Sequence, residues 1–403
     1  MTDGTNQTKQ KILFYRYGNI CEPDLASCFM QAGLTVVTEE TQVTKKETTA
    51  AETAQTVAGM LQEEQYLFVF SVNFFPAVSE VCQICRVPYV CWTVDCPVME
   101  LFSPALANDC NRVFLFDRAQ YECFAPRAGK RNVYHLPLAT NPARWDQVIA
   151  DAGEDAKERF GAEVSFVGSL YTEKNRYREI RDELREYTKG SLDALAEAQT
   201  HLYGYAFLEE RLTGDIIQEL EALVPAMRGA LCAGDAKAKR AYSAHMLLDW
   251  EATQRERVRL LESVAQRFAL SLYTHSDASF VPHAKVRPGV QTLTEMPLVF
   301  RYSKINLNIT MRSIEKGLPL RIFDICGAGG FLLTNYQEEL AEQYAIGEEV
   351  ECFASEEELL DKIAFYLEND DARERIARKG YERTRAEHTY FHRMHAMIQE
   401  LSG

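Results

Sequence analysis

The sequence of 403 residues contains no apolar run approaching the 18 or more residues that a membrane-spanning helix needs. Its first ten residues are polar and lack the basic start and apolar centre of a secretory signal peptide. Basic residues are also scarce, since 44 Lys and Arg stand against 59 Asp and Glu and leave a formal charge of −15. Broad nucleic-acid binding normally leaves a basic surface. We therefore expect a cytoplasmic protein with no nucleic-acid partner and no stable membrane insertion.

Several catalytic motifs are missing as well. The chain has no Asp-x-Asp, the usual carboxylate pair for a metal-bound nucleotide sugar, no Walker loop and no Gly-x-Ser-x-Gly. Among its 11 cysteines, Cys82 and Cys85 form a Cys-x-x-Cys pair, but they fall in an expected helix over 76–85. Structural zinc prefers such pairs in loops, which favours buried, reduced thiols here. We expect neither a metal nor another cofactor.

Short β-rich segments alternate with helical patterns through the first 140 residues. The segments are 11–16, 34–38, 66–71, 87–92, 112–116 and 132–136. Several are continuously apolar, as parallel strands covered on both faces are, so the alternation predicts a Rossmann-like α/β domain over 1–145. Ligands of such sheets bind outside the carboxyl ends of the strands. That rule indicates Gly18 and Asn19 after the first strand and Asp95 after the fourth.

A second α/β domain is expected over 161–385, after a polar and strand-free linker at 146–160. Its strands are expected at 164–169, 268–273, 289–294, 305–310 and 331–334. The first crossover is unusually long, because 174–266 is nearly all helical in pattern and predicts a helical insertion. Residues 386–403 are expected to form a C-terminal helix that crosses back to the N-terminal domain. The fold class is therefore α/β, with two Rossmann-like domains facing across a cleft.

The segment Glu315-Lys-Gly-Leu-Pro-Leu-Arg-Ile-Phe-Asp324 carries a signal for a nucleotide ligand. Pro319 fits the first position of a helix, where a missing N–H is no loss. The amides of Gly317 and Leu318 would then lie at the positive end of that helix, which attracts phosphate. In the same helix, Asp324 is placed to accept hydrogen bonds from a ribose diol.

The same segment has an ordinary structural explanation. Arg321 and Asp324 are spaced as a surface pair, and the glycines that include Gly329 and Gly330 are typical of a left-handed helix end before a strand. A glycine cluster alone is a weak motif, so both interpretations stay open from spacing.

A second candidate follows the first strand of the second domain. Gly168, beside Ser169, allows close approach of a ligand, and the cations Lys174 and Arg176 are suited to neutralising a diphosphate. The alternative is that both cations are solvated in the first turn of a helix. That alternative is weakened because cations there oppose the helix dipole.

Two sets of longer motifs extend over nearly the whole chain. The C-terminal set is Tyr302-Ser-Lys-Ile-Asn-Leu-Asn-Ile-Thr310, Gly317-Leu-Pro-Leu-Arg-Ile-Phe-Asp324, Gly329-Gly-Phe-Leu-Leu-Thr-Asn335 and His388-Thr-Tyr390. The N-terminal set is Trp92-Thr-Val-Asp-Cys-Pro97, Phe114-Leu-Phe-Asp117 and His135-Leu-Pro-Leu-Ala139. Together they closely resemble the spore-maturation CgeB-like family of glycosyltransferases and the domain that usually precedes it. The resemblance implies the GT-B fold, with a nucleotide-sugar-binding C-terminal domain and an acceptor-side N-terminal domain.

The resemblance also implies an activity: metal-independent, retaining transfer from a UDP-sugar to a protein or surface-glycan acceptor. Glu315 and Asp324 resemble the family's pair of acidic residues, which act on the sugar and on the ribose. Here the second is Asp rather than Glu, and eight residues intervene where seven is usual. This departure shifts weight from Glu315 toward Gly317, Arg321 and Asp324. Lys174 or Arg176 resembles the basic position that stabilises the leaving diphosphate.

The catalytic candidates are thus Asp95, Lys174 and Glu315. Asp95 has two equal interpretations, as the group that orients or deprotonates the acceptor and as a structural residue bonding local amides. The substrate-binding candidates are Gly18, Asn19, Gly168, Ser169, Arg176, Tyr302, Lys304, Gly317, Leu318, Arg321, Asp324, Gly329 and Gly330. A non-catalytic glycan- or nucleotide-binding assembly factor and a nucleotide-sugar epimerase remain as alternatives.

Overall fold

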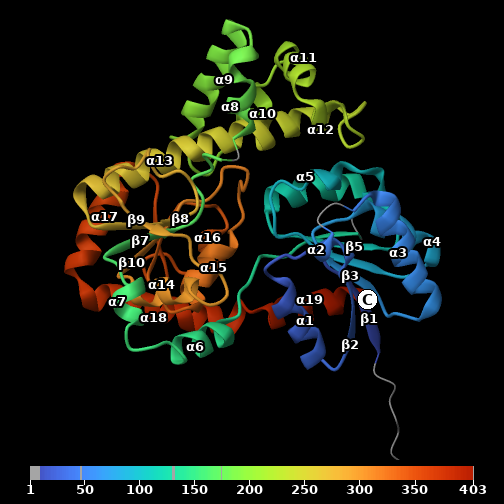
Figure 1. Cartoon of the computed structure of the whole chain (residues 1–403), viewed down its shortest axis with the longest axis horizontal. Helices are drawn as coiled ribbons and strands as arrows, with labels where there is room; N and C mark the ends of the chain where they lie inside the picture. Colours follow the sequence, from blue (N-terminus) through green and yellow to red (C-terminus); the bar gives the residue numbers. More distant parts are fainter. Residues whose placement is uncertain (1–9, 46–47, 129–131, 174, 403) are drawn as a thin grey trace, which may run out of the picture. The chain divides into compact units, whose positions relative to one another are not determined.

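The computed structural model describes residues 10–45, 48–128, 132–173 and 175–402. The chain divides into two compact units, each coloured along the sequence in Figure 1. Unit 1 is Met1–Pro137 with Tyr390–Gly403, and unit 2 is Leu138–Thr389. In the part of the chain that the structure describes, no helix is both long and apolar enough to cross a membrane.

Unit 1 is built on a parallel sheet of order β2-β1-β3-β4-β5-β6. Its strands are β1 (Lys11–Tyr15), β2 (Thr35–Glu39), β3 (Val69–Val72), β4 (Tyr89–Trp92), β5 (Asn111–Leu115) and β6 (Val133–His135). All residues of β3 and β4 are buried, which explains their largely apolar sequence. The prediction of a doubly wound domain is confirmed.

Helices cover both faces of this sheet. They are α1 (Glu22–Gln31), α2 (Thr41–Thr44), α3 (Ala50–Glu63), α4 (Pro76–Cys85), α5 (Arg118–Ala128) and α19 (Tyr390–Ser402), with 3-10 turns η1 (Met99–Phe102) and η2 (Pro104–Ala107). The last helix of the chain, α19, packs against the first, α1, so the two ends of the sequence share one core (Figure 1). The rings of Tyr390 and Trp92 pack edge to face, with their centres 6.1 Å apart.

Unit 2 has a second parallel sheet, of order β12-β11-β10-β7-β8-β9. Its strands are β7 (Val164–Val167), β8 (Leu270–Thr274), β9 (Lys285–Pro288), β10 (Ile305–Asn308), β11 (Leu332–Asn335) and β12 (Glu351–Phe353). The surrounding helices are α6 (Pro142–Ala150), α7 (Ala156–Phe160), α14 (Met296–Tyr302), α15 (Leu320–Gly327), α16 (Leu340–Gln343), α17 (Glu356–Glu368) and α18 (Asp370–Glu387). Residues 146–160, expected to be a linker, thus contribute to α6 and form α7.

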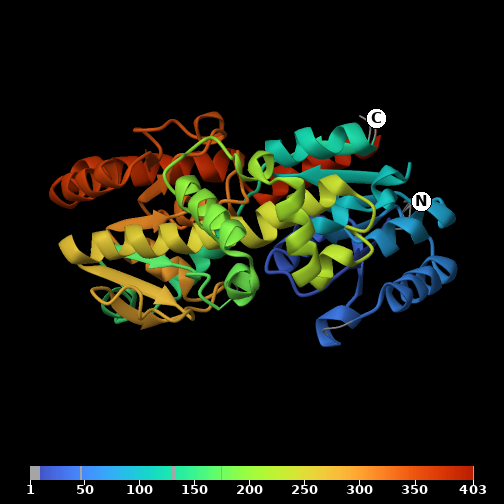
Figure 2. The ribbon, with the colours of Figure 1, turned by 90° about the horizontal axis from the view of Figure 1, so that it is seen from above.

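The expected helical insertion lies between β7 and β8. It comprises α8 (Arg176–Ile180), η3 (Arg181–Glu183), α9 (Glu186–Gln199), α10 (Leu208–Arg211), α11 (Gly214–Leu223), η4 (Pro225–Arg228), α12 (Ala236–Ala241), the π-helix η5 (Tyr242–Leu248) and α13 (Asp249–Arg267). The long helix α13, yellow in Figures 1 and 2, packs against β8 and also contacts α8 and α9. This confirms the insertion inferred from 174–266.

One strand prediction is wrong. Residues 289–294 form no strand, and the edge strand β9 lies just before them, at Lys285–Pro288. Three of its four residues are exposed, so β9 lacks the apolar pattern that identifies a buried strand. Gly289 begins the following loop, where a Cβ would lie 2.1 Å from His275 Nε2. The glycine therefore serves close packing of two loops.

In each sheet, chain order reverses beside one central strand. In unit 1 the strands continue on opposite sides of β1, to β2 and to β3, and in unit 2 on opposite sides of β7, to β8 and to β10. Crevices at such switch points, outside the carboxyl ends of the strands, are where open α/β sheets bind ligands. Both candidate sites below lie at these points.

Gly330 allows a direct test of packing at the start of β11. A Cβ there would lie 2.6 Å from Phe300 O and 2.7 Å from Asn306 Nδ2, both inside the unit 2 core. We expect Gly330→Ala to destabilise the protein by about 1–3 kcal/mol because the backbone must shift. As a control, Gly190→Ala in α9, where a Cβ meets nothing within 4 Å, should stabilise by about 0.5–1 kcal/mol. Urea unfolding measures both, and equal stability of the two variants would contradict this packing.

Candidate functional site

The loop after β1 in unit 1 is held by one buried carboxylate. Glu22, fully buried in α1, accepts hydrogen bonds from the backbone N of Tyr17 at 2.9 Å and of Gly18 at 3.1 Å. It also pairs with Arg16 Nε at 3.1 Å. Gly18 has a φ of +92°, a conformation that favours glycine. The first α/β loop of unit 1 is thereby fixed at the switch point.

Asn73, directly after β3, organises the polar groups at this edge. Its Nδ2 donates to Tyr17 Oη at 2.7 Å and to Asp95 Oδ2 at 2.6 Å. Its Oδ1 accepts from the backbone N of Val94 at 2.9 Å and of Asp95 at 3.3 Å. Asn19 Nδ2 donates to the same Tyr17 oxygen at 2.9 Å. The structure therefore brings the predicted residues Asn19 and Asp95 into one cluster beside Gly18.

Sequence reasoning missed Tyr17 and Asn73 in this cluster. Burial, followed by the negative charge of Asp95, raises the pKa of Tyr17 above its ordinary value, so its hydroxyl stays protonated. Asn73 has a φ of +59°, which asparagine tolerates better than most residues. The available signal was an asparagine immediately after a continuously apolar strand. Asp95 is exposed, with one oxygen fixed by Asn73.

In unit 2, the carboxyl end of β7 is lined by Gly168, Ser169 and a buried arginine. Arg257 of α13, 8% exposed, donates Nη1 to Ser169 O at 2.6 Å and both Nε and Nη2 to Ile309 O, after β10. A Cβ at Gly168 would lie 3.9 Å from Arg257 Nη1. The guanidinium thus bridges the ends of β7 and β10 at the switch point.

Arg257 has no carboxylate partner among the described residues. Its guanidinium lies 4.8 Å from the centre of the Tyr171 ring and 5.4 Å from that of Phe166. Burial lowers its pKa, because the charged form loses hydration. Three of its five N–H groups donate to backbone carbonyls, and the Tyr171 side chain is a further hydrogen-bond partner.

The predicted residue Arg321, near the start of α15, lies in the same region. It contacts Met296 Sδ and the Phe300 ring, 5.4 Å from its guanidinium. Burial lowers the pKa of Arg321. The charge of Asp324 raises it and the like charge of Arg257 lowers it, and the pKa stays below its ordinary value. The two guanidiniums of Arg257 and Arg321 are thus close enough to affect each other, and Asp324 offsets part of the charge of Arg321.

The loop between β10 and α15 is pinned by a buried ion pair. Arg312 bonds Glu256 of α13 through Nε and Nη2, each at 2.7 Å, and both side chains are buried. Arg312 also donates to the carbonyls of Thr200 and Leu202 in the insertion. Tyr203 covers the pair, with its hydroxyl 2.6 Å from Glu256 Oε1. The insertion and the loop between β10 and α15 are therefore held together by buried polar contacts.

Glu315, a predicted catalytic residue, faces a histidine of the insertion rather than Arg257. His245 of η5 lies with Nε2 3.8 Å from Glu315 and 3.5 Å from Glu209, and with Nδ1 2.8 Å from Asp249. Burial opposes protonation, but the hydrogen bonds to Asp249 and Glu209 and the charge of Glu315 raise the pKa of His245 well above its usual value. The histidine therefore carries a positive charge at neutral pH.

The start of α15 differs slightly from expectation. Pro319 is the N-cap, with ψ at 157°, and Leu320 is the first helical residue, one position later than predicted. Extended backbone is usual at an N-cap. Gly317 and Leu318 are buried just before it, and Gln337 Nε2 donates to Gly317 O at 3.1 Å. The helix start is thus firmly placed after the pinned loop.

Asp324 is nine-tenths buried and has a structural partner. Its Oδ1 accepts a hydrogen bond from Thr140 Oγ1 at 2.7 Å, and that hydroxyl in turn accepts from Trp145 Nε1 at 2.7 Å. A Cβ at Gly327 would clash with Thr140, at 2.6 Å. Asp324 therefore attaches the segment around α6 to α15, while its ribose role stays a prediction.

The structure describes only one of the two cations expected after β7. Lys174 lies outside the described residues. Arg176 is exposed as the first residue of α8, and its Nη1 donates to Tyr242 Oη of η5 at 2.8 Å. Arg176 thus occupies the first helical turn, as the structural alternative had it, and contacts the insertion.

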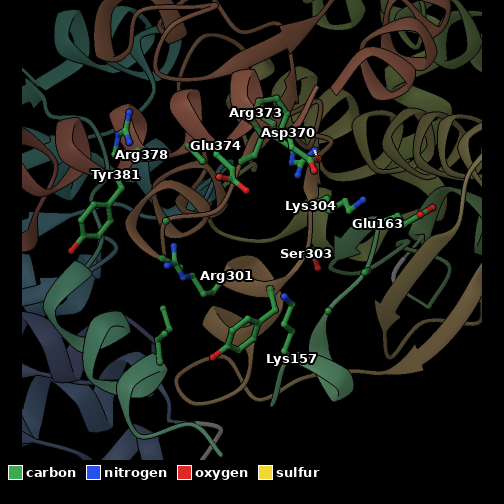
Figure 3. Close-up of a pocket in the computed structure, with 18 of the residues that line it drawn as sticks. Lys157, Glu163, Arg301, Ser303, Lys304, Asp370, Arg373, Glu374, Arg378 and Tyr381 are labelled. Atoms are coloured by element: carbon green, nitrogen blue, oxygen red, sulfur yellow. Dashed lines mark ion pairs between the residues drawn. The ribbon is translucent and has the colours of Figure 1, made fainter. Parts of the chain in front are cut away.

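Four predicted residues do not belong to this edge. Tyr302 and Lys304 precede β10, and Gly329 and Gly330 precede β11, so they lie at the amino ends of parallel strands. The motifs that contain them run along the strands, and residues before and after a strand lie at opposite edges. They therefore do not share an edge of the sheet with Gly168 and Arg321, and their role in substrate binding stays a prediction. Tyr302 and Lys304 line a separate pocket, in which Lys304 is labelled in Figure 3.

The chain is similar to known glycosyltransferases in part of its sequence and in its fold. Residues 251–399 match the profile of a family described as "Glycosyl transferase-like". No curated protein matches the sequence. Among solved structures, a glycosyltransferase from Rickettsia africae is similar with a TM-score of 0.57 and 8% identity, covering 98% of both chains. Sucrose-phosphate synthase from Thermosynechococcus elongatus has a TM-score of 0.58 and 10% identity, covering 98% of this chain and 99% of that one.

A third similar structure is HepE of Anabaena, solved with UDP and glucose, with a TM-score of 0.52 and 12% identity over 98% of this chain and 99% of that one. At such identities the likeness establishes the GT-B fold, and the family match over residues 251–399 agrees with it. The chain is a glycosyltransferase. The predictions of fold and enzyme class are confirmed.

The Arg312–Glu256 pair of this glycosyltransferase makes a strong stability prediction. Glu256→Gln leaves a buried guanidinium without its counter-charge, which costs about 3–5 kcal/mol. Urea unfolding should show that loss. The control is Glu348→Gln, which removes the exposed pair with Lys379 at 2.9 Å and should change stability by less than about 1 kcal/mol. Similar losses for both variants would show that burial of the first pair is unimportant.

The His245 cluster predicts a pH-dependent contribution to stability. Because the folded pKa lies above the usual 6.5 or so, the contribution is complete below that pH and is lost as pH rises through the folded value. His245→Gln should therefore be most destabilising at pH 6, with the gap to wild type narrowing toward pH 9. Urea midpoints across this range measure the gap. The control is His283→Gln at a largely exposed site, and a gap at position 245 that does not change with pH would refute the charged state.

Proposed function

We propose that this glycosyltransferase uses a UDP-sugar donor, bound at the carboxyl edge of β7 and β10 in unit 2. The observation that carries the proposal is the pair Arg257 and Arg321, two guanidiniums close enough to affect each other near Gly168 at the switch point. A diphosphate would supply the missing negative charge and accept the N–H groups that Arg257 leaves unused. HepE of Anabaena, which shares the fold, was solved with UDP.

The arrangement suits a reaction that releases a diphosphate. When the bond from the anomeric carbon to the phosphate oxygen breaks, negative charge grows on the leaving group. Fixed cations and helix-end amides in a buried site stabilise that charge without reorganising. Arg257 and Arg321 supply the cations, and Gly317 and Leu318, just before α15, supply amides. Lys174 and Arg176 follow β7 and would reinforce this positive field.

The finer features of the reaction belong to the same proposal. Transfer is metal-independent and retaining, the acceptor is a protein or surface glycan, and the CgeB-like family remains our assignment on the motifs quoted above. Glu315, held by His245, is placed by this proposal near the transferred sugar. Asp95 of unit 1, held by Asn73 with one oxygen, orients the acceptor hydroxyl and removes its proton.

UDP binding and slow donor hydrolysis test the proposal. We expect UDP at 100 times its Kd to stabilise the protein by about 2.7 kcal/mol, seen as a raised Tm. Arg321→Gln should weaken UDP binding about 10- to 100-fold, because a charge-assisted hydrogen bond contributes about 1.5–3 kcal/mol. The matched control is Arg267→Gln, an exposed arginine at the end of α13, which should bind UDP like wild type.

Mass spectrometry of products from a panel of UDP-sugars follows the chemistry. Free sugar and UDP are the expected products without an acceptor. Absence of both UDP stabilisation and hydrolysis would refute the proposal in favour of a non-catalytic binding protein. Release of an isomerised sugar without acceptor would instead identify an epimerase.

A further inference from the structure

Unit 2 contains a second large cavity at the opposite edge of its sheet. Its volume is about 1250 Å³, and its walls come from α6, α7, α14, α18 and the segments that enter β7, β10 and β11 (Figure 3). All these strand segments are at amino ends, whereas the donor region lies at the carboxyl ends of β7 and β10. The buried strand β10 separates the two regions.

Four cations from different elements line this cavity. They are Lys157 of α7, Arg301 of α14, Lys304 before β10 and Arg378 of α18, and all four are exposed. None forms an ion pair with another described residue, although Arg373 nearby is paired with Asp370 at 2.6 Å. Like charges from four separate elements repel each other at one cavity, and an anionic ligand would reduce that repulsion.

The backbone makes room for one of these cations. Gly329 has a φ of +73°, and a Cβ there would lie 3.0 Å from Arg301 Nη1. The glycine that the sequence motif offered as a donor-site residue thus lets the guanidinium lie against the chain at the cavity wall. Figure 3 shows Arg301 and Lys157 on the same side of the open space.

A buried hydroxyl in the wall lacks a partner. Ser303 is 7% exposed and lines the cavity, and its Oγ makes no hydrogen bond to any described residue. A buried hydroxyl normally finds a partner, because leaving it unpaired costs free energy. A ligand with polar groups would satisfy it. This observation is independent of the four cations.

The remaining wall groups define what kind of ligand fits. Glu163 and Glu374 are exposed at the cavity and are acceptors without a described ion-pair partner. Tyr302 and Phe331 add aromatic surface, and Tyr381 Oη donates to Asp146 at 2.8 Å. Carboxylates accept hydrogen bonds from hydroxyls, whereas cations bind phosphate. A molecule with both a phosphate and several hydroxyls matches this mixture better than a bare anion.

We propose that this cavity is a second ligand site, which binds a phosphorylated sugar through Lys157, Arg301, Lys304 and Arg378 at the phosphate and through Ser303, Glu163 and Glu374 at the hydroxyls. The site is separate from the donor region and does not depend on the identity of the donor. Ligand binding at this site involves no covalent step.

Isothermal titration of the full-length protein with glucose 6-phosphate tests the site. We expect saturable binding that excess UDP does not abolish, with inorganic phosphate and glucose each at least tenfold weaker. The double variant Lys157→Gln/Arg301→Gln should bind glucose 6-phosphate at least tenfold more weakly. The matched control Arg267→Gln/Lys285→Gln removes the same charge at exposed positions outside the cavity and should bind like wild type.

Ser303→Ala separates binding from folding. Because the hydroxyl has no partner without ligand, we expect the Tm of the free variant to equal or exceed that of wild type, while glucose 6-phosphate binds at least threefold more weakly. Absence of saturable binding by wild type would overturn the proposal. So would equal losses in the charge-matched control, competition by UDP for the same sites, or inorganic phosphate binding as tightly as the sugar phosphate.

Discussion

The buried pair of Arg312 and Glu256 holds unit 2 of this glycosyltransferase together. It joins three parts that are distant in sequence: the loop after β10, the helix α13 and the carbonyls of Thr200 and Leu202 in the insertion. A buried ion pair is costly unless its remaining groups are satisfied, and here the guanidinium donates to two carbonyls as well as the carboxylate. Because the loop is fixed, the start of α15 and its amides have a defined position.

The same principle, polar groups fixed by buried partners, recurs at the first sheet. Glu22 holds the loop after β1, and Asn73 uses both ends of its amide to hold Tyr17, Val94 and Asp95. In both units a rigid parallel sheet ends in loops whose conformation depends on side chains from elsewhere in the chain. Preorganised groups of this kind are what transfer chemistry requires, since they need not reorganise as charge develops.

The sequence predicted the sheets well because buried parallel strands are largely apolar, and α4 begins and ends at the expected residues. It missed β9, because three of its four residues are exposed and the strand lacks a buried apolar pattern. Arg257 was not predictable as a site residue, since it lies 88 residues from Ser169 in an ordinary helical pattern. Tyr302 and Lys304 were grouped with Arg321 because a linear motif does not tell which end of a strand its residues occupy.

The fact that one linear segment reaches both edges of the sheet through β10 has a thermodynamic consequence. The segment 301–312 runs from Arg301 at one edge of the sheet, through the four residues of β10, to Arg312 at the other. The strand itself spans roughly 13 Å at about 3.3 Å per residue, and its buried side chains cannot shift independently of their neighbours. Binding free energies are functions of state, so any factor by which occupancy of one edge alters affinity at the other must act equally in return. Any coupling between ligand binding at the two edges joined by β10 is thus reciprocal.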